Sequence, residues 1–276
     1  MSRSKAKRSP TRSITPADIP VVIFAGGRGT RLMEETQLIP KPMVTIGGMP
    51  ILLHIMRYYS TYGFRKFIIC LGYKGSVIKN YFLDLPKHMQ SLVINVGSGR
   101  SEFHRAEISD WTISLIETGE NSLTGTRLRK VAQYIDAPHF CLTYGDGVGT
   151  IDLDKELAFH LKHGRLGTVS AVHPPSRFGR LEISGSGVVT SFREKEMLPN
   201  DHINGGFFMF RKEFLKRLPK NENVSLEAEP LVQLAEDGEL SAYRHEGFWM
   251  CMDTLRDRET LEQLVDSGNA PWMRWK

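Results

Sequence analysis

Short apolar runs alternate with segments of helical periodicity along the first half of the chain, and no other feature constrains the fold as strongly. The run PVVIFA at 20–25 is typical of a buried strand. Residues 50–62 carry apolar side chains on one helix face, and Gly63 follows them as a helix-ending residue. KFIICLG at 66–72 is the next expected strand, and GSVIKNYF at 75–82 is the next helix. This order predicts a parallel sheet covered by helices on both faces.

The same alternation continues into the middle of the chain. The strand-like run WTISLIET occupies 111–118, and a helix is expected over 124–135. The run HFCLTYGDG that follows predicts a strand that ends on Asp146. Because open parallel sheets bind ligands at the carboxyl ends of their strands, Asp146 is a candidate functional residue.

The later half of the chain changes character. GTVSAVHP, GRLEIS, VVTSFREK and INGGFFMF are short strand-like segments with few helices between them, which predicts a mixed or antiparallel section on the edge of the same sheet. A helix over 254–267 is expected near the end. No linker rich in Pro, Gly or Ser separates the halves. We therefore expect one α/β domain over 19–276, with a Rossmann-like, mostly parallel mixed sheet flanked by helices and a small antiparallel section.

The net positive charge of the chain comes from its first 18 residues. Five of the 36 basic residues precede Asp18, the first acidic one, which leaves 31 basic against 31 acidic residues in the remainder. A neutral body lacks the net positive charge typical of nucleic-acid binders, so no nucleic-acid partner is expected. Segment 1–18 is rich in Ser, Lys and Arg and poor in apolar residues, which predicts a disordered basic tail. Its composition also resembles a transit peptide, but it has no amphipathic apolar face.

Three cysteines, Cys70, Cys141 and Cys251, each lie inside an apolar run. Their odd number and wide spacing favour reduced, mostly buried thiols over disulfides or a catalytic cysteine. No run approaches the ~20 apolar residues of a membrane-spanning helix. We therefore expect a cytoplasmic protein without a membrane partner.

The stretch FAGGRGTRL, residues 24–32, directly follows the first expected strand. Glycines allow backbone N–H groups to approach an anion closely, and Arg31 adds a fork of donors. The dinucleotide fingerprint fails because Leu32 stands where its third glycine belongs, and no G-K-S/T follows as a P-loop needs. A plain tight turn explains the glycines alone equally well, but Arg31 and Lys41 favour phosphate binding.

These motifs together resemble the sugar-phosphate nucleotidyltransferase family. The segments that carry the resemblance are FAGGRGTRL…PKPMVTIGG, GYKG, YGDGV, INGGFF, EPL..LA..GEL, GFW..MDTLRD and APW. The likeness extends from about Val21 to Trp275, and EET at 34–36, PKPMV and GFW..MDT are most similar to the cytidylyltransferases of the family. The resemblance implies the nucleotide-diphospho-sugar transferase type of fold. It also implies transfer of CMP from CTP to α-D-glucose 1-phosphate, with CDP-glucose and pyrophosphate as products.

The family's motifs, carried over residue by residue, imply a nucleotide site. Its members are Ala25, Gly26, Gly27, Gly29, Thr30, Arg31, Lys41, Ser122, Arg127 and Gly145. Arg31, Lys41 and Lys195 form the implied catalytic set. Lys41 stands between two prolines, which suits an ammonium held against the phosphates as charge moves to pyrophosphate, although a solvated lysine is the common alternative. Arg127 is expected at the cytosine edge or, equally, as a solvated residue in the first turn of a helix.

The family's matching carboxylates, Asp146 and Asp253, are implied to bind Mg²⁺, a hard cation that takes oxygen ligands. A strand-end aspartate that caps a turn is the alternative for each. His160 and His163 also suggest a metal site, but no third ligand is obvious near them in the sequence. Partial positive charge at the end of a helix explains these histidines better.

Four residues are implied at the sugar-phosphate site: Glu194, Lys195, Asn204 and Gly205. Lys195 matches the family's phosphate-binding lysine. The family motif reads E-K-P, whereas Glu196 stands here in place of the proline and puts a carboxylate beside the site. A surface charge cluster is the alternative for Lys195, and a strand bulge is the alternative for Gly205.

Three functions stay open on the residues alone. The first is Mg²⁺-dependent cytidylyl transfer that supplies CDP-linked deoxysugars, and the second is a nucleotidyltransferase that uses another nucleotide or hexose phosphate. The third is a catalytically silent, nucleotide-binding regulatory subunit, against which the joint presence of Lys41, Asp146, Lys195 and Asp253 speaks. Family members are oligomers with sites near subunit contacts, so the resemblance implies a homo-oligomer.

Overall fold

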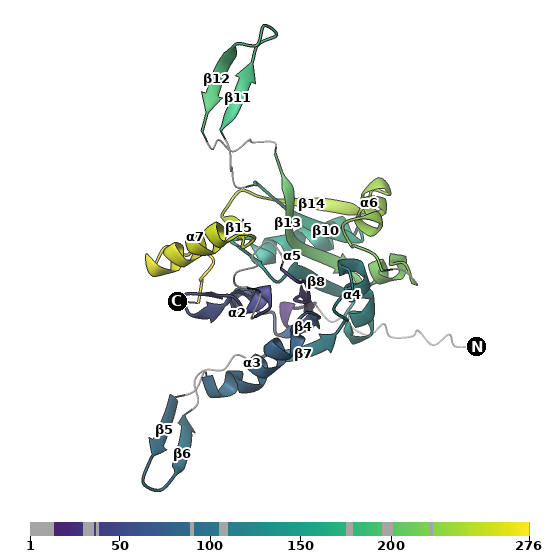
Figure 1. Ribbon diagram of the computed structural model, residues 1–276. Helices are drawn as coiled ribbons and strands as arrows, with labels where there is room; N and C mark the ends of the chain where they lie inside the picture. Colours follow the sequence, from purple (N-terminus) through teal and green to yellow (C-terminus); the bar gives the residue numbers. More distant parts are fainter. Residues whose placement is uncertain are drawn as a thin grey trace, which may run out of the picture.

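The computed structural model of the protein describes residues 14–29, 36, 39–88, 91–104, 110–174, 179–194, 201–220 and 223–275. Its centre is a seven-stranded sheet with the strand order β14-β10-β13-β8-β1-β4-β7 (Figure 1). The strands are β1 (Pro20–Phe24), β4 (Lys66–Leu71), β7 (Thr112–Glu117), β8 (His139–Tyr144), β10 (Gly167–Val172), β13 (Ile203–Arg211) and β14 (Leu240–His245). Neighbouring strands are parallel, except that β13 is antiparallel to β8 and β10. The predicted mostly parallel mixed sheet is confirmed.

Helices pack on both faces of this sheet, because alternate residues of a strand point to opposite sides. Val21 and Ile23 of β1 belong to one apolar core, whereas Val22 and Phe24 belong to the other. The first core takes side chains from α2 (Ile51–Thr61), α3 (Gly75–His88), α5 (Leu153–His163) and α7 (Leu255–Asp266). The second takes them from α4 (Thr124–Val131), α6 (Glu229–Glu236) and η5 (Lys212–Arg217). The helices predicted at 50–62, 75–82, 124–135 and 254–267 are all confirmed.

Two β-hairpins project from the body (Figure 1). One consists of β5 (Ser91–Asn95) and β6 (Arg100–His104), and the other of β11 (Arg180–Ile183) and β12 (Val189–Arg193). The prediction placed GRLEIS and VVTSFREK on the edge of the main sheet, and this was wrong. The chain leaves the sheet between β10 and β13, and these two strands already pair with each other, so no free edge is available there.

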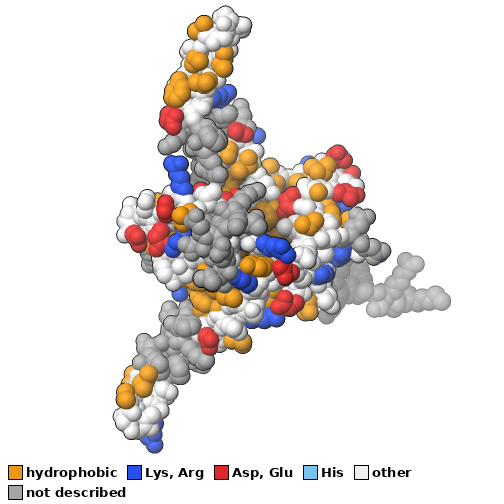
Figure 2. Space-filling view, viewed as in Figure 1, with side chains coloured by type: hydrophobic (Ala, Val, Ile, Leu, Met, Phe, Trp, Pro, Cys, Tyr) orange, Lys and Arg blue, Asp and Glu red, His pale blue; other side chains and the backbone are white. Residues whose placement is uncertain are grey.

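The projecting hairpin of β11 and β12, called the β11–β12 arm below, has an uncovered apolar face (Figure 2). Leu181 pairs with Phe192, and Ile183 pairs with Val189 after a register shift, and Figure 2 shows apolar side chains gathered on this arm. All four are exposed. Two-stranded hairpins are only marginally stable in water by themselves, so the β11–β12 arm, with its apolar face uncovered, is a marginally stable part of the isolated chain.

The described chain begins with an ordered turn ahead of β1. The 3-10 helix η1 (Pro16–Asp18) is closed by Ile19 N–H, which donates to the Pro16 carbonyl at 3.1 Å. These residues belong to the segment predicted as tail, so ordered structure starts before the predicted boundary at 18. The rest of that segment, residues 1–13, lies outside the described residues, and its disorder stays a prediction.

The prediction of buried, free thiols is confirmed for two of the three cysteines. Cys70 and Cys141 are buried, and Cys251 is half-buried. Among the described residues, no helix combines the length and the apolarity needed to cross a membrane.

The two histidines near the end of α5 form a buried hydrogen-bond chain. Thr168 Oγ1 lies 2.8 Å from His160 Nδ1 and 2.8 Å from His163 Nε2. Burial lowers the pKa of His160 to about 3, and burial also lowers the pKa of His163. The interpretation of this pair as positive charge at a helix end was therefore wrong, because His160 is neutral at physiological pH.

Glu156 is a carboxyl group buried inside the core. It lies on α5 with 1% of its surface exposed, and its Oε1 accepts a hydrogen bond of 2.8 Å from Ser170 Oγ on β10. Burial raises the pKa of Glu156 to about 8, because the apolar surroundings solvate a carboxylate poorly.

We expect Glu156→Gln to flatten the pH dependence of stability. Folding raises this pKa from 4.5 to about 8, so the native state keeps a proton that the unfolded chain loses, and wild-type stability falls as the pH rises through that window. Between about pH 5 and about pH 8, wild type should lose roughly 3 kcal/mol of stability relative to Glu156→Gln, because the buried histidines contribute equally to both proteins. Urea unfolding at both pH values measures it, with the exposed change Asp154→Asn as control. Equal pH dependence in wild type and Glu156→Gln would contradict the prediction.

Candidate active site

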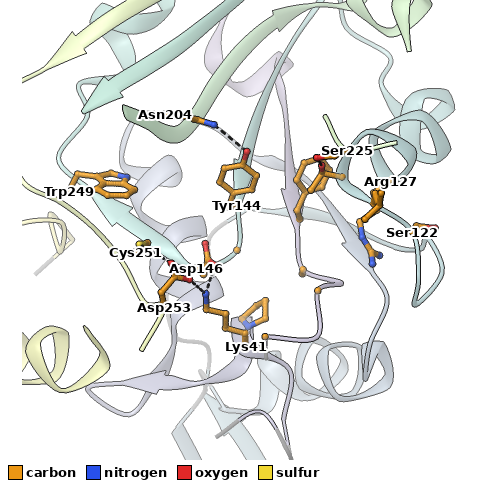
Figure 3. Close-up of a pocket in the computed structure, with 18 residues that line it drawn as sticks. Lys41, Ser122, Arg127, Tyr144, Asp146, Asn204, Ser225, Trp249, Cys251 and Asp253 are labelled. Atoms are coloured by element: carbon orange, nitrogen blue, oxygen red, sulfur yellow. Dashed lines mark hydrogen bonds and ion pairs between the residues drawn. The ribbon is translucent and has the colours of Figure 1, made fainter. Parts of the chain in front are cut away.

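A cavity of about 540 Å³ opens at the carboxyl ends of β1 and β8 (Figure 3). Its volume lies in the range of small-molecule sites. The lining comes from the loop after β1, from the 3-10 helix η3 (Lys41–Met43), from the strand ends and from α4. The predicted site residues that line it are Ala25, Gly27, Gly29, Lys41, Ser122, Arg127, Gly145, Asp146, Asn204 and Asp253. Residues predicted from separate motifs thus meet in one place.

The loop that follows β1 turns tightly at this cavity. Ala25 N–H donates to the Cys70 carbonyl at 3.1 Å, and Tyr73 N–H donates to the Gly26 carbonyl at 3.2 Å, so the loop is tied to the end of β4. Gly29 has a φ of +62°, a left-handed conformation that glycine adopts at little cost. Thr36 Oγ1 donates to the Gly29 carbonyl at 3.1 Å.

Arg127 on α4 is buried beside this loop, with 3% of its surface exposed. Its Nη1 donates to the Leu71 carbonyl at 3.0 Å and to Thr118 Oγ1 at 2.6 Å. Its Nη2 donates to the Gly26 carbonyl at 2.9 Å and to the Glu120 carbonyl at 3.2 Å. The alternative of a solvated arginine was therefore wrong, because the first turn of α4 packs against the ends of β1, β4 and β7.

The position of the guanidinium explains two glycines. A Cβ atom on Gly26 would lie 2.1 Å from Arg127 Nη1, and a Cβ atom on Gly72 would lie 2.6 Å from the same nitrogen. Both distances are far inside van der Waals contact. The guanidinium fills the space that these glycines leave, and it joins three strand ends through their oxygen atoms.

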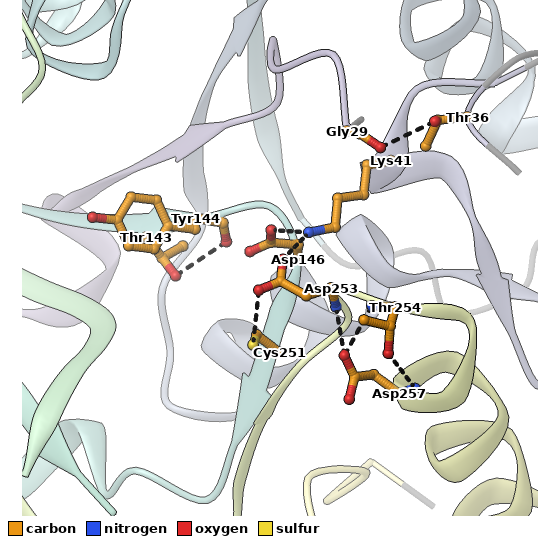
Figure 4. A network of polar contacts seen from close by, with 10 residues as sticks. All are labelled: Gly29, Thr36, Lys41, Thr143, Tyr144, Asp146, Cys251, Asp253, Thr254 and Asp257. Atoms are coloured by element: carbon orange, nitrogen blue, oxygen red, sulfur yellow. Dashed lines mark hydrogen bonds and ion pairs between the residues drawn. The ribbon is translucent and has the colours of Figure 1, made fainter. Parts of the chain in front are cut away.

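Lys41 bridges two aspartates that are far apart in the sequence (Figure 4). Its Nζ lies 2.6 Å from Asp146 Oδ2 and 2.7 Å from Asp253 Oδ1. Lys41 begins η3, a single turn in which Pro40 and Pro42 flank it. Because proline restricts the backbone, the ammonium is presented from a stiff turn.

A short antiparallel ribbon brings the two carboxylates together. β9 (Gly147–Gly149) directly follows Asp146, and it pairs with β15 (Trp249–Cys251), which ends two residues before Asp253. Met252 N–H continues the ribbon by donating to the Asp146 carbonyl at 2.8 Å. The remaining ribbon, β2 (Thr45–Ile46) with β3 (Met49–Pro50), and the 3-10 helix η4 (Ala132–Tyr134) lie outside the cavity wall.

Charge in this part of the site is negative. Burial disfavours the ammonium of Lys41, but the carboxylates of Asp146 and Asp253 outweigh burial and raise the pKa of Lys41 above its usual value. The group therefore stays a cation at neutral pH and balances one of the two carboxylates. Asp257 Oδ2 accepts the N–H of Asp253 at 3.1 Å in the capping box that begins α7, which fixes the backbone under the second carboxylate. Two oxygen ligands with excess negative charge suit a hard divalent cation.

Polar groups on another wall of the cavity converge on Tyr144 (Figure 3). Its hydroxyl donates to Glu227 Oε1 at 2.5 Å and accepts from Asn204 Nδ2 at 3.4 Å. Burial raises the pKa of Tyr144, so the hydroxyl stays protonated. Trp249 Nε1 donates to the Gly205 carbonyl at 2.7 Å. This wall offers an amide, a hydroxyl and an aromatic surface, which suit the hydroxyl groups and faces of a sugar.

Several residues of the cavity wall escaped the sequence analysis. They are Phe24, Pro42, Tyr144, Ser225, Trp249 and Cys251. Tyr144 and Trp249 stand inside the motifs YGDGV and GFW, and that position was a usable signal. Cys251 was expected to be structural, and its position in the wall does not make it a nucleophile. Burial raises the pKa of Cys251 to about 12, and the neighbouring aspartates add to the effect.

Some predicted site residues do not line the cavity. Gly26 and Gly205 are next to lining residues in the chain and contact them as described above. Glu194 directly follows β12 at the base of the β11–β12 arm and is exposed. The predicted residues that lie outside the described part of the chain are Thr30, Arg31 and Lys195. Their roles stay predictions.

Comparison with known proteins identifies the family of the chain. The nucleotidyl transferase model matches residues 20–257. The chain belongs to that family. A glucose-1-phosphate cytidylyltransferase from Salmonella typhi is 48% identical over 256 residues, which are 92% of this chain and 99% of that protein. A Bacillus subtilis protein named "Probable glucose-1-phosphate cytidylyltransferase" is 41% identical over 254 residues, with the same coverage of 92% and 99%.

The fold of the nucleotidyl transferase family recurs in solved structures. The crystal structure of HddC from Yersinia pseudotuberculosis aligns with a TM-score of 0.64 at 26% identity and covers 90% of this chain and 99% of that chain. The resemblance predicted from the motifs is thereby confirmed, and the protein is a nucleotidyltransferase. The matched region contains the glycine loop, Lys41 and both aspartates.

We expect Arg127→Lys to loosen the glycine loop without changing the charge. One ammonium cannot reach the carbonyl and hydroxyl acceptors that the guanidinium spans, so at least one charged hydrogen bond is lost, at a cost of roughly 1.5–3 kcal/mol. The free energy of unfolding should fall by that amount, and nucleotide should bind more weakly by equilibrium dialysis. Arg28→Lys is the control, because Arg28 is exposed and donates to side chains that are themselves exposed, Glu120 and Asn121. Arg127→Lys with wild-type stability and nucleotide affinity would contradict an anchoring role.

Proposed function

We propose that this nucleotidyltransferase transfers CMP from CTP to α-D-glucose 1-phosphate, giving CDP-glucose and pyrophosphate, with Mg²⁺ as its metal. The observation that carries the proposal is the pair Asp146 and Asp253, joined by Lys41 in a cavity that also contains the glycine loop. The nucleotide and the sugar come from the names of the Salmonella typhi and Bacillus subtilis relatives.

The proposed reaction needs positioned charge rather than a general base. A phosphate oxygen of glucose 1-phosphate attacks the α-phosphorus of CTP, and the bond to the pyrophosphate oxygen opposite the attack breaks. Since this phosphate is already anionic near neutral pH, no proton has to be removed. The protein must hold two polyanions in line and neutralise the charge that moves to pyrophosphate.

Asp146 and Asp253 are the residues that would hold the metal. Their oxygens already lie within 2.7 Å of a single cation, the ammonium of Lys41, which supports a shared site for positive charge. Nucleotidyltransferases generally need a divalent metal, and Mg²⁺ is the choice for carboxylate ligands and phosphates, whose negative charge it neutralises when bound.

Lys41 has a different role from the two aspartates. Its ammonium lies between two carboxylates that would otherwise repel each other. With a metal held by Asp146 and Asp253, the ammonium of Lys41 would be free to bind the phosphate oxygens of the leaving pyrophosphate. Its stiff turn at η3 limits the movement to the side chain, so the charge remains close to the cavity.

The two ends of the cavity suit different parts of the substrates. Backbone N–H groups of the glycine loop are available for the triphosphate, and Arg127 holds that loop in place. Ser122, beside Arg127 in the cavity wall, is assigned to the nucleotide. Asn204 and Gly205 are assigned to sugar hydroxyls, because they adjoin Tyr144 and Trp249 on the opposite wall.

Three further assignments rest on the family motifs. Thr30 and Arg31 continue the glycine loop, and we assign them to the phosphates of the nucleotide. Lys195 is assigned to the phosphate of the sugar, together with Glu194, its neighbour in the sequence. Arg31, Lys41 and Lys195 together supply the positive charge that two polyanions require.

We also propose a cytoplasmic homo-oligomer. Buried free thiols such as Cys70 and Cys141 suit a reducing compartment. The uncovered apolar face of the β11–β12 arm, with Leu181 and Phe192, suits contact with a second copy of the chain.

Release of pyrophosphate with glucose 1-phosphate and Mg²⁺ tests the function, with CTP, UTP, dTTP, ATP and GTP compared in parallel. We expect strong preference for CTP. Activity with a different nucleotide would keep the reaction type and reject the cytidylyl assignment. Folded protein that binds nucleotide but releases no pyrophosphate with any of them would reject catalysis and favour a regulatory subunit.

We expect Asp146→Asn and Asp253→Asn to lower turnover by roughly two to three orders of magnitude, the usual effect of losing one strong electrostatic contact to a transition state. The amide keeps the size of the side chain and removes the negative charge. Steady-state rates at saturating CTP measure the loss, and Asp136→Asn, an exposed change on the protein surface, is the control. Near-normal turnover in both cavity variants would reject the metal assignment.

A further inference from the structure

A second cluster of metal-binding side chains lies outside the cavity wall, at the root of the β11–β12 arm. His173, His202 and Glu246 each offer one ligand atom, and these atoms all lie within 4.8 Å of one another. His173 directly follows β10, His202 directly precedes β13 and Glu246 directly follows β14. These strands are neighbours in the sheet, so the topology brings together three side chains that are distant in the sequence.

The hydrogen bonds of His173 direct its Nε2 toward the carboxylate of Glu246. Nδ1 lies 3.1 Å from the carbonyl oxygen of Asp201, which can only accept, so Nδ1 carries a hydrogen. Nε2 lies 2.6 Å from Glu246 Oε2, which is the second acceptor at this ring. The ring thus donates to two acceptors. A carbonyl on Nδ1 is the usual support for a histidine that binds metal through Nε2.

His202 supplies a buried nitrogen that needs a partner. Among the described residues, His202 Nε2 has no hydrogen-bond partner, and it lies 3.6 Å from Glu246 Oε1. Buried polar atoms rarely stay unsatisfied, and each one calls for an explanation. Ligands held at about 2.0–2.2 Å around tetrahedral zinc are roughly 3.3–3.6 Å apart, which matches the separation of His202 Nε2 and Glu246 Oε1.

We propose that His173, His202 and Glu246 form a second metal site, which takes a divalent transition metal of the zinc type. Two imidazoles and one carboxylate are the donor set that Zn²⁺ favours, whereas Mg²⁺ favours oxygen ligands alone. The Glu246 side chain is 69% exposed, so an ion reaches the site from solvent and water completes its coordination. The site is separate from Asp146 and Asp253 in both residues and chemistry.

A metal at this site connects strand ends that lie next to the β11–β12 arm. His202 stands two residues before Asn204, and Glu246 stands three residues before Trp249, and both of these neighbours line the cavity. Coordination therefore ties the start of β13 to the ends of β10 and β14 beside the proposed sugar wall. We expect the bound metal to raise the stability of the fold.

Cobalt is the probe of choice, because its visible absorption reports imidazole coordination. Metal-free protein in millimolar Mg²⁺, which keeps the carboxylate pair supplied with its own ion, is titrated with Co²⁺ by absorption and with Zn²⁺ by calorimetry. We expect one tightly bound ion per chain and an affinity weakened at least about 100-fold in His202→Gln and in Glu246→Gln. Glu236→Gln, an exposed change on α6, should bind as wild type does.

Thermal unfolding separates loss of the site from loss of the fold. In chelator, both variants should unfold at the wild-type temperature, and added Zn²⁺ should raise the midpoint of wild type and of Glu236→Gln only. The proposal is overturned if wild type binds no Co²⁺ at micromolar concentrations. It is also overturned if His202→Gln and Glu246→Gln keep the wild-type spectrum and affinity, or gain as much thermal stability from Zn²⁺.

Discussion

The parallel pairing of β1 with two neighbours is the constraint on which the rest of the site depends. Phe24, the last residue of β1, stands opposite Cys70 at the end of β4 and opposite Tyr144 at the end of β8. All of β1 is buried, so its own side chains contribute packing and no chemistry. Because the three strands end at one edge, the glycine loop, the carbonyls that Arg127 binds and the carboxylate of Asp146 come within reach of each other. The apolar strand β1 thus positions polar groups that belong to other segments of the chain.

The buried guanidinium of Arg127 and the half-buried ammonium of Lys41 have different roles at that edge. Arg127 is bound to backbone carbonyls and one hydroxyl, which are neutral, so its charge stabilises strand ends and does not depend on a bound ligand. Lys41 is bound to two carboxylates, which a competing cation can take over. The guanidinium suits the first task because its rigid fork reaches several acceptors, and the ammonium suits the second because it moves on a flexible stem. The chemistry of each side chain therefore agrees with its fixed or exchangeable position.

The sequence predicted what is local and what recurs in short motifs. The strand and helix periods gave the class of fold, and the glycine loop, PKP, YGDG and MDT gave residues that do meet in the cavity. The arm was assigned to the sheet because strands in a projecting hairpin and in a sheet edge share the same alternation. The burial of Arg127 could not be predicted from the sequence, since its partners are mainly backbone oxygens of distant strands. The contact of His173, His202 and Glu246 depends on the order β14-β10-β13, which periodicity does not determine.

That strand order also places the two proposed metal sites at the same end of the sheet, and the two differ in chemistry. Asp146 and Asp253 present oxygen alone, whereas the cluster at the root of the arm presents two imidazoles and one carboxylate. Hard and borderline cations are sorted by such differences in ligand type more than by affinity in general. An ion in the second site therefore does not have to compete with the ion of the reaction. Trp249 links the two regions, because its ring lines the cavity while its Nε1 binds the carbonyl of Gly205, three residues from His202. A structural change at the root of the arm would consequently reach the proposed sugar wall before the carboxylate pair, so we expect it to affect sugar binding more than nucleotide binding.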